Sequence, residues 1–322
     1  MSEPLVLGID VGGTKLAGVA VSGTHVVAQS RIPLGSGALG DQVISLAREL
    51  TAGSGNGVLA GIGLAVPGQV DTTSGIIELA VNLEARGLPI GSIVSAELEV
   101  PCYVEHDARA VASWLSTERR QADLAFVSVG TGVSAGVVLD GRLLHGTDGL
   151  AGEIGHVLGD PAGPRCSCGL TGCVEALTSG PAVARAAAEA VATGAASALA
   201  ARPSTAEVYE AAANGDPLAE RIVARAAGHL AAAIRGIALT FGVRRIVVGG
   251  GVTRAGTAFA RPLHAALDRE RSISALVALA LTADAVEVLD DDRPLGALGA
   301  AAVARANVGA ASPAAGREVG QR

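Results

Sequence analysis

The sequence contains one pattern twice, and this repeat restricts the fold more than any other feature. In each copy an apolar run ends in a glycine-rich turn. Two further apolar runs, joined by a turn of their own, follow. The copies stay in step without a gap: Val11-Gly12 matches Val129-Gly130, Ala17-Gly18-Val19 matches Ala135-Gly136-Val137, and Gly23 matches Gly141. Glycine permits tight turns and close backbone approaches. The repeat therefore predicts two similar domains, each opening with a strand, a turn and a hairpin.

Strand-like and helical segments alternate along the chain, which predicts α/β sheets covered on both faces. Helix 41–50 is expected to have an acidic N-cap, and Pro67-Gly68 is expected to form a turn. The tail from about Asn307, rich in Ala, Gly and Pro, is predicted to be disordered. The expected strands are 5–10, 16–21, 26–31, 58–66, 101–105, 245–248 and 286–289, and the expected helices are 41–50, one starting near residue 107, 216–241 and 295–306.

Composition limits the class of protein. The 322 residues suffice for two domains, and 49% apolar with 17% charged residues is a globular profile. A net charge of −7 argues against a nucleic-acid-binding surface. No apolar run is expected to span a bilayer, and the first strand leaves no room for a signal peptide. Three of the four cysteines lie within eight residues, which favours a metal site in a reducing cytoplasm over disulfides.

The first glycine-rich turn, Asp10-Val11-Gly12-Gly13-Thr14-Lys15, has the residues of a phosphate-binding loop. Glycines allow backbone N–H groups to face an anion, Thr14 adds a hydroxyl, and Lys15 adds a positive charge. Asp10 can hold Mg²⁺ through water. The spacing is not that of a Walker A loop. A glycine-rich turn with a surface lysine is the alternative interpretation.

Two further glycine clusters extend this prediction. Gly130-Thr131-Gly132 is the corresponding loop of the second half, and two such loops on facing domains would place a triphosphate in the cleft between them. Gly249-Gly250-Gly251 ends another strand and could lie along the adenosine. Packing of that strand end against the long helix is the alternative.

The most specific motif is Gly152-Glu153-Ile154-Gly155-His156 followed by Cys166-x-Cys168 and Cys173-x-Glu175. One imidazole and three thiolates form the ligand set of a closed structural zinc site, predicted on His156, Cys166, Cys168 and Cys173. Cys102 stands apart and is expected to be a small core residue. Glu153 and Glu175 flank the ligands and could accept hydrogen bonds from sugar hydroxyls, or be solvated loop residues.

Asp107 follows a strand, where α/β sheets usually present their ligand sites. An aspartate there can take the proton from an attacking hydroxyl during phosphoryl transfer. It is equally suited to be a helix N-cap.

Together these motifs resemble the ROK family of sugar kinases, within the actin-like, hexokinase superfamily. The resemblance extends from Asp10 to the run Pro294-Leu295-Gly296-Ala297, and the stretch from Gly152 to Glu175 matches the family signature almost residue for residue. It implies two RNase-H-like (actin-like ATPase) domains with a cleft between them. We expect an N-terminal domain of residues 1–117 completed by helix 295–306, a C-terminal domain of 118–294 with the zinc loop, and a tail of 307–322.

The resemblance also implies functions for individual residues. Asp107 is expected to be the catalytic base, with ATP and a hexose as substrates, Mg²⁺ accompanying ATP as a cofactor, and structural Zn²⁺ on the His/Cys ligands. The residues expected to contact the sugar are Gly68, Asn82, His106, Asp107, Glu153, His156 and Glu175. Glucose phosphorylation at the 6-hydroxyl is the expected reaction.

Three departures from the family pattern concern mainly the sugar. The family usually has Asn where this chain has His106, and a Trp after the Asn-Leu element where this chain has Glu84-Ala85-Arg86-Gly87. Ser134 stands where glycine is common. His106 could still bond a sugar hydroxyl, but it is larger and can become charged near neutral pH. The alternatives are kinases for N-acetylmannosamine, N-acetylglucosamine, allose or fructose, and a weakly catalytic regulatory sugar-binding relative.

Regulatory family members carry an N-terminal DNA-binding domain, for which this chain has no room before its first strand. The expected protein is therefore cytoplasmic, a homodimer or homotetramer, with no nucleic-acid or membrane partner.

Overall fold

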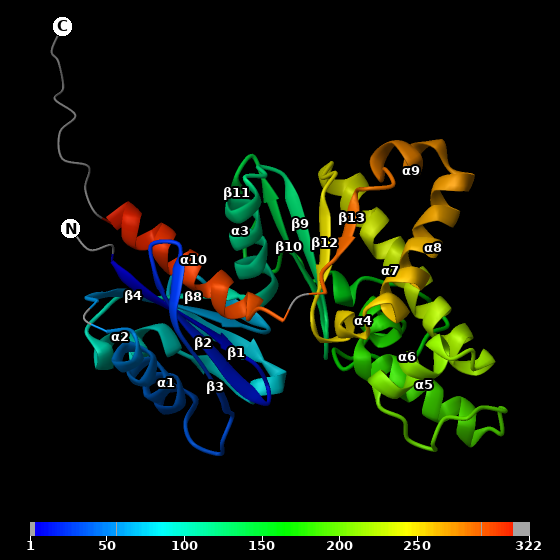
Figure 1. Cartoon of the computed structure of the whole chain (residues 1–322), viewed down its shortest axis with the longest axis horizontal. Helices are drawn as coiled ribbons and strands as arrows, with labels where there is room; N and C mark the ends of the chain where they lie inside the picture. The colour runs from blue at the N-terminus through cyan, green and yellow to red at the C-terminus, as the bar shows by residue number, and fades with distance from the viewer. Residues whose placement is uncertain (1–3, 56, 291, 312–322) are drawn as a thin grey trace, which may run out of the picture. The chain divides into compact units, whose positions relative to one another are not determined.

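The computed structural model describes residues 4–55, 57–290 and 292–311, which form two compact units, each built on a mixed β-sheet (Figure 1). Unit 1 combines the chain up to Glu118 with Gly146–Gly149 and the stretch from Arg293. Unit 2 combines Arg119–His145 with Leu150–Asp292. The chain therefore leaves unit 2 for four residues and returns to it.

Unit 1 holds a five-stranded sheet of order β3-β2-β1-β4-β8, in which β4 runs parallel to both β1 and β8. A smaller antiparallel sheet, β5-β6-β7, was not expected from the sequence. The elements are β1 (Leu5–Val11), β2 (Lys15–Ser22), β3 (His25–Pro33), α1 (Leu39–Gly53), β4 (Leu59–Val66), β5 (Gln69–Asp71), β6 (Ile76–Ala80), β7 (Ala85–Leu88), α2 (Ile90–Leu98), β8 (Cys102–His106), α3 (Asp107–Arg119) and α10 (Leu295–Ala311).

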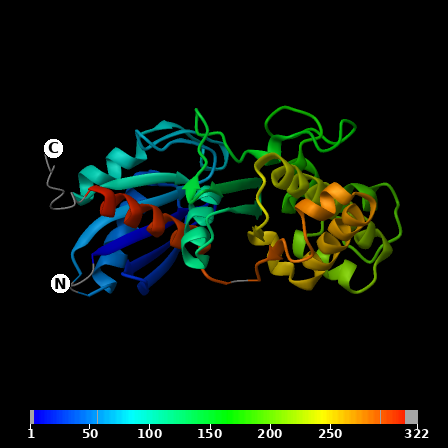
Figure 2. The ribbon, with the colours of Figure 1, turned by 90° about the horizontal axis from the view of Figure 1, so that it is seen from above.

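Alternate residues of β1 face different layers of unit 1, as the two-residue period of a strand requires. Leu7 and Ile9 pack with the buried face of α1, whereas Val6 packs with alanines of α10. Figures 1 and 2 show α10 (red) lying along this sheet. A Cβ on Gly63 would come within 1.8 Å of a backbone oxygen of α10, so the glycine permits this close approach.

Unit 2 repeats the arrangement in a sheet of order β11-β10-β9-β12-β13, with β12 parallel to β9 and β13. The elements are β9 (Leu124–Val129), β10 (Val133–Leu139), β11 (Arg142–Leu143), α4 (Val174–Thr178), α5 (Gly180–Ala192), α6 (Thr205–Ala213), α7 (Pro217–Phe241), β12 (Ile246–Gly249), α8 (Thr257–Ile273), α9 (Ala275–Ala280) and β13 (Val286–Val288). Short 3₁₀ turns occupy Val81–Leu83, Ile154–His156 and Gly251–Ala255.

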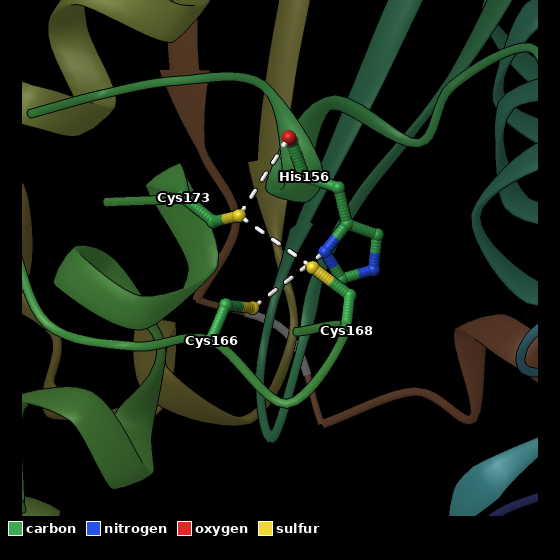
Figure 3. Close-up of side chains that lie close together, drawn as sticks. All are labelled: His156, Cys166, Cys168 and Cys173. Atoms are coloured by element: carbon green, nitrogen blue, oxygen red, sulfur yellow. Dashed lines mark hydrogen bonds between the residues drawn. The ribbon is translucent and has the colours of Figure 1, made fainter. Parts of the chain in front are cut away.

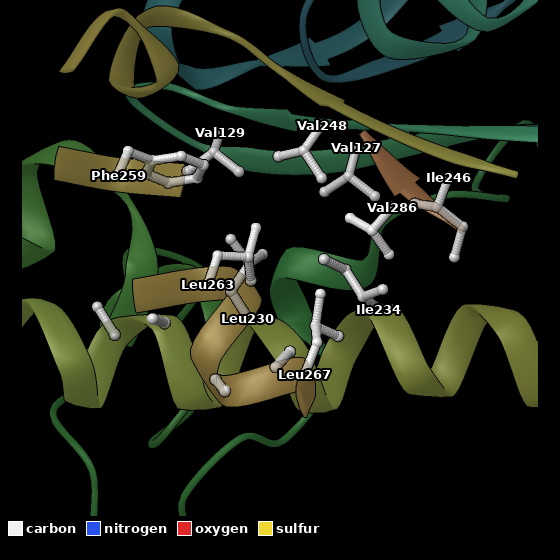
Figure 4. Packing of buried hydrophobic residues seen from close by; sticks show 14 of the residues in the cluster. Val127, Val129, Leu230, Ile234, Ile246, Val248, Phe259, Leu263, Leu267 and Val286 are labelled. Carbon is white, nitrogen blue, oxygen red and sulfur yellow. The ribbon is translucent and has the colours of Figure 1, made fainter. Parts of the chain in front are cut away.

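The core of unit 2 lies between its sheet and helices α7 and α8 (Figure 4). Val127 and Val248 from the strands face Leu230 and Ile234 of α7 and Leu263 of α8. Branched aliphatic side chains fill this layer, consistent with the 2% aromatic content. The predicted α/β class is confirmed, and within unit 2 helices α7 and α8 cover one face of the sheet.

Helix α7 begins and ends where the sequence predicts. The Asp216 carboxylate accepts hydrogen bonds from the amides of Leu218 and Ala219, and Pro217 stands at the first helical position. Gly242 ends the helix with φ of 71°. By length and composition alone α7 could cross a membrane, in contrast to the expectation from the sequence, but its buried residues belong to the core of unit 2.

Two local predictions were wrong. Helix α1 starts at Leu39 after Ala38, which makes no side-chain cap, so Asp41 lies within the first turn, where its charge suits the helix dipole. Helix α10 continues to Ala311, so residues 307–311 are helical. The remainder of the predicted tail, 312–322, lies outside the described residues.

Candidate active site

The predicted phosphate loop of unit 1 connects β1 to β2. Its ends are joined by a hydrogen bond from the Gly12 amide to the Lys15 carbonyl (3.0 Å). Gly13 and Thr14 are exposed, and a Cβ on Gly13 would lie 3.1 Å from the Asn82 carbonyl oxygen. The predicted sugar residue Asn82 therefore lies directly beside the predicted phosphate loop.

Asp10, near the end of β1, is the carboxylate of this loop, and its pKa is shifted. Burial first, and the negative charge of Asp107 second, raise its pKa to about 7, while Lys15 and Arg31 act in the opposite direction. A Cβ on Gly296, in the first turn of α10, would lie 2.5 Å from the Asp10 carboxyl carbon. The Asp10 carboxylate thus lies at the positive end of α10, which favours its charge, and near Asp107, which opposes it.

Asp107 begins α3 directly after β8, two strands away from β1 in the sheet. Its Oδ1 accepts a hydrogen bond from the Ala108 amide (2.5 Å) and lies 3.3 Å from His106 Nδ1. An N-cap would instead accept from the second or third amide of the helix. About a third of the Asp107 side chain is exposed (34%), so the carboxylate can reach a ligand.

His106 is buried, with 4% of its side chain exposed. Its contact with Asp107 Oδ1 suits a residue that orients the carboxylate. Gly68 has φ of 88°, and a Cβ there would lie 2.3 Å from the Leu79 carbonyl oxygen, so this turn requires glycine. These two positions, with Asn82, lie in unit 1.

The second loop, in unit 2, is held by a carboxylate. Glu175 Oε2 accepts a hydrogen bond from the Val133 amide (3.0 Å), and a Cβ on Gly132 would lie 2.7 Å from that oxygen. Gly180 donates its amide to the Gly130 carbonyl oxygen (2.9 Å), and Thr131 is exposed at the tip. Glu175 was predicted as a sugar contact, and here it supports the loop.

The three glycines after β12 lie beside this loop. A Cβ on Gly250, which has φ of 110°, would lie 2.5 Å from the Val129 carbonyl oxygen, and one on Gly249 would touch the Phe126 ring. A Cβ on Gly251 would meet no atom within 4 Å. Gly249 and Gly250 therefore serve close packing, and Gly251 borders open space.

The predicted metal ligands come together in unit 2. The four ligand atoms of His156, Cys166, Cys168 and Cys173 lie within 4.8 Å of one another (Figure 3). Cys168 Sγ is 3.7 Å from Cys173 Sγ, and Cys166 Sγ is 3.8 Å from His156 Nδ1. A tetrahedral zinc site with Zn–S distances near 2.3 Å separates its sulfurs by about 3.8 Å. The cluster is thus compatible with structural zinc.

His156 also faces a predicted sugar residue. Its Nε2 lies 3.8 Å from Glu153 Oε2, while its Nδ1 points at the sulfur cluster. Cys102, by contrast, lies in unit 1, and burial raises the pKa of its thiol to about 12. It is a packing residue, as predicted.

Two charged residues behind Asp107, Glu105 and Arg109, were not predicted from the sequence to contribute to the site. Arg109 is completely buried in the first turn of α3, and its Nε donates to Glu105 Oε1 (2.8 Å). A cation in this position opposes the helix dipole, and that conflict was the available signal.

Comparison with known proteins now adds to this geometry. The ROK family model matches residues 6–307. The chain belongs to the ROK family. It is 33% identical to a glucokinase of Halalkalibacterium halodurans over 82% of this chain and 85% of that one. It is 34% identical to an N-acetylmannosamine kinase of Shigella flexneri over 77% and 83%.

Solved ROK structures confirm the predicted fold class. A ROK glucokinase from Streptomyces griseus, in complex with glucose and AMPPNP, superimposes with a TM-score of 0.77 at 26% identity, covering 94% of this chain and 99% of that one. The predicted resemblance, resting on the loop around Asp10 and the run from Gly152 to Glu175, is likewise confirmed.

Proposed function

We propose that this ROK protein transfers the γ-phosphoryl group of ATP to the 6-hydroxyl of a hexose, with glucose as the preferred substrate. The observation that carries the proposal is the placement of Asp10 and Asp107 at the carboxyl ends of β1 and β8, beside a glycine-rich loop with a lysine. In-line phosphoryl transfer needs a base for the attacking hydroxyl and positive charge for the phosphates. Unit 1 has both, and its relatives include glucokinases.

Asp107 is the proposed general base. Both of its contacts, with the Ala108 amide and His106 Nδ1, go to Oδ1. Oδ2 is then the oxygen that takes the proton while the sugar oxygen bonds to the γ-phosphorus and ADP leaves with the electron pair of the broken P–O bond.

Lys15, Thr14 and the amide of Gly13 are proposed to bind phosphate oxygens, while Gly12, whose amide donates to the Lys15 carbonyl oxygen, shapes the loop. Burial and the neighbouring Asp107 raise the pKa of Asp10 to about 7, and a carboxylate beside a second acid suits a group that would hold Mg²⁺ through water. Bound Mg²⁺ neutralises charge on the transferred phosphoryl group. In unit 2, Gly130, Thr131, Gly132 and Gly251 are the proposed nucleotide contacts, with Gly249 and Gly250 shaping the loop.

The His/Cys cluster is proposed to bind structural zinc. Its interatomic distances fit a closed tetrahedral site, which leaves no position for water and supplies folding energy instead of chemistry. The Nε2–H of His156 would then face Glu153, as metal-bound histidines commonly face a carboxylate.

Glu153, His156 and Glu175 are the proposed sugar contacts from unit 2, and Gly68 and Asn82 those from unit 1. His106 stays a predicted sugar contact, although its burial beside Asp107 supports a role in orienting the base. A cytoplasmic location and a homodimeric or homotetrameric state complete the proposal.

The test is a coupled assay of ATP consumption with glucose, N-acetylmannosamine, N-acetylglucosamine, allose and fructose. We expect the highest kcat/KM with glucose, and ³¹P NMR should identify a 6-phosphate product. The relative from Shigella flexneri favours N-acetylmannosamine as the second candidate. A preference for that sugar would correct the substrate, and no turnover with any sugar would leave a sugar-binding regulatory relative.

A further inference from the structure

A buried arginine lies next to the proposed base. Arg109 is 0% exposed in the first turn of α3, and its partner Glu105 is 4% exposed by its side chain. Burying two charges is costly even when they are paired, and a cation at a helix N-terminus also opposes the helix dipole. Neither helix formation nor apolar packing accounts for an arginine at this position.

Glu105 and Arg109 make hydrogen bonds to two different parts of unit 1. Glu105 Oε1 accepts hydrogen bonds from Arg109 Nε (2.8 Å) and from the His106 amide (2.8 Å), which fixes the junction of β8 and α3. Arg109 NH1 donates to the carbonyl oxygen of Gly149 (2.6 Å), forty residues further along the chain. The guanidinium therefore connects the residues around Asp107 to a distant segment.

That segment, Gly146–Gly149, is the four-residue stretch that the chain contributes to unit 1 between two stretches of unit 2. Gly149 has φ of 68°, and a Cβ there would lie 2.7 Å from the Val70 carbonyl oxygen of β5. Close packing against β5 and the hydrogen bond from Arg109 together hold the segment on unit 1.

The segment leads directly to a proposed sugar contact. Glu153 follows Gly149 by four residues, and four residues of extended chain span at most about 14 Å. Asp107 precedes Arg109 by two residues on the same helix. One side chain is therefore bound both to the helix end that carries the base and to the segment that limits the reach of Glu153.

We propose that Arg109 is a positioning residue: by binding Glu105 and the Gly149 carbonyl oxygen it fixes the start of α3, which carries the base, and anchors on unit 1 the segment from which the chain continues to the sugar-binding Glu153. This inference rests on the proposed function, in which Asp107 and Glu153 both act on the sugar. It concerns the sugar side of the reaction and not the binding of ATP.

The first experiment displaces the segment without changing any charge. Gly149→Ala places a methyl group against the Val70 carbonyl oxygen, whereas the control Gly141→Ala introduces the same left-handed backbone strain (φ of 72°) where a Cβ meets no atom within 4 Å. We expect Gly149→Ala to lower kcat/KM for glucose at least about tenfold, through both kcat and KM, with KM for ATP within about twofold. Gly141→Ala should keep all three values.

The second experiment changes the arginine. Lysine keeps the charge but cannot bond Glu105 and Gly149 with one planar fork. Arg109→Lys is compared with Arg119→Lys, at the end of the same helix, where Arg119 forms a two-bond pair with the exposed Glu287. Arg109→Lys should reproduce the kinetic change of Gly149→Ala and raise amide hydrogen exchange in residues 146–153 about tenfold, and Arg119→Lys should do neither.

The outcomes separate the possibilities. Wild-type exchange and wild-type glucose kinetics in both Arg109→Lys and Gly149→Ala would overturn the proposal, as would a lowered melting temperature with an unchanged KM for glucose. If the wild-type protein phosphorylates no sugar, the proposed function fails, and the exchange comparison alone then decides whether Arg109 holds the segment.

Discussion

The two units have the same sheet topology but differ in the loops that their first hairpins present. Sheets β3-β2-β1-β4-β8 and β11-β10-β9-β12-β13 have matching strand order and direction. In the matched sequence, Asp10 corresponds to Ser128 and Lys15 to Val133. The repeat preserved the backbone of the hairpin and not its charges. One scaffold therefore carries ionic chemistry in unit 1 and offers backbone amides in unit 2.

The loops are also supported differently. The Gly12 amide bonds to the Lys15 carbonyl oxygen, while the Gly130 amide bonds to Gly132, so the second loop closes one residue earlier. The second loop further depends on the Glu175 carboxylate, whose Oε1 lies near Ser167 and Cys166 of the proposed zinc loop. Loss of the metal should therefore disturb the loop of unit 2 and spare that of unit 1.

The largest expected effect tests this dependence. Cys168→Ser removes one proposed zinc ligand and should lower the free energy of unfolding by at least about 3 kcal/mol, because zinc-binding energy is part of folding energy. Cys102→Ser, in unit 1, should cost about 1 kcal/mol. Denaturant unfolding and metal analysis measure both. Equal stability of wild type and Cys168→Ser, or wild-type protein purified without zinc, would refute the zinc assignment.

The next effect tests the division of charge between the loops. Lys15→Met should raise KM for ATP or lower kcat by about 10–100-fold in total, because a phosphate loses a charged partner. Thr131→Ala, at the exposed tip of the second loop, should change kcat/KM for ATP by less than about fivefold. Steady-state kinetics with ATP varied decides the matter. If Thr131→Ala lowers kcat/KM for ATP more than Lys15→Met does, the loop of unit 1 is not the principal phosphate site.

The smallest effect concerns the pH dependence of stability. Folded Asp10, whose pKa near 7 lies above the ordinary aspartate value of 3.8, keeps a proton that the unfolded chain has released, so its contribution to stability falls as pH rises from about 4 to about 7. Asp10→Asn cannot ionise. It should therefore be more stable than wild type by at least about 1 kcal/mol at pH 8 without added Mg²⁺, and nearly equal at pH 4.

Thermal unfolding across this pH range gives the comparison. If the difference in stability between Asp10→Asn and wild type stays constant with pH, the pKa of Asp10 is not raised in the folded protein. A gap that grows with falling pH would show the opposite shift.

Local patterns in the sequence predicted most of the fold and the residues of the His/Cys cluster. Buried runs, turn glycines and the Asp216-Pro217 cap specify their elements within a few residues of chain, so β1, β12 and α7 were predicted to within about one residue. The members of the His/Cys cluster were predictable because three cysteines lie close together in sequence. Strands β5, β6 and β7 were missed because they are short and without a clear period, and are defined by pairing with one another.

Tertiary contacts explain the remaining differences. Arginine is usually a surface residue. The burial of Arg109 depends on its hydrogen bond to the Gly149 carbonyl oxygen, and no local sequence pattern predicts that contact. Glu175 was predicted from its motif as a sugar contact, while its bond to the Val133 amide depends on the folded hairpin. His106 was predicted to face the sugar, and only the structure shows its side chain buried beside Asp107.

The most direct test of the account is the turnover of Asp107→Asn with glucose and MgATP. The variant keeps the shape of the side chain but cannot take the proton, so kcat should fall by about 100-fold or more while calorimetric Kd values for glucose and the ATP analogue AMPPNP stay within about threefold of wild type. A kcat close to wild type would contradict the account, because Asp107 would then be a structural residue at the start of α3 and the base would lie elsewhere.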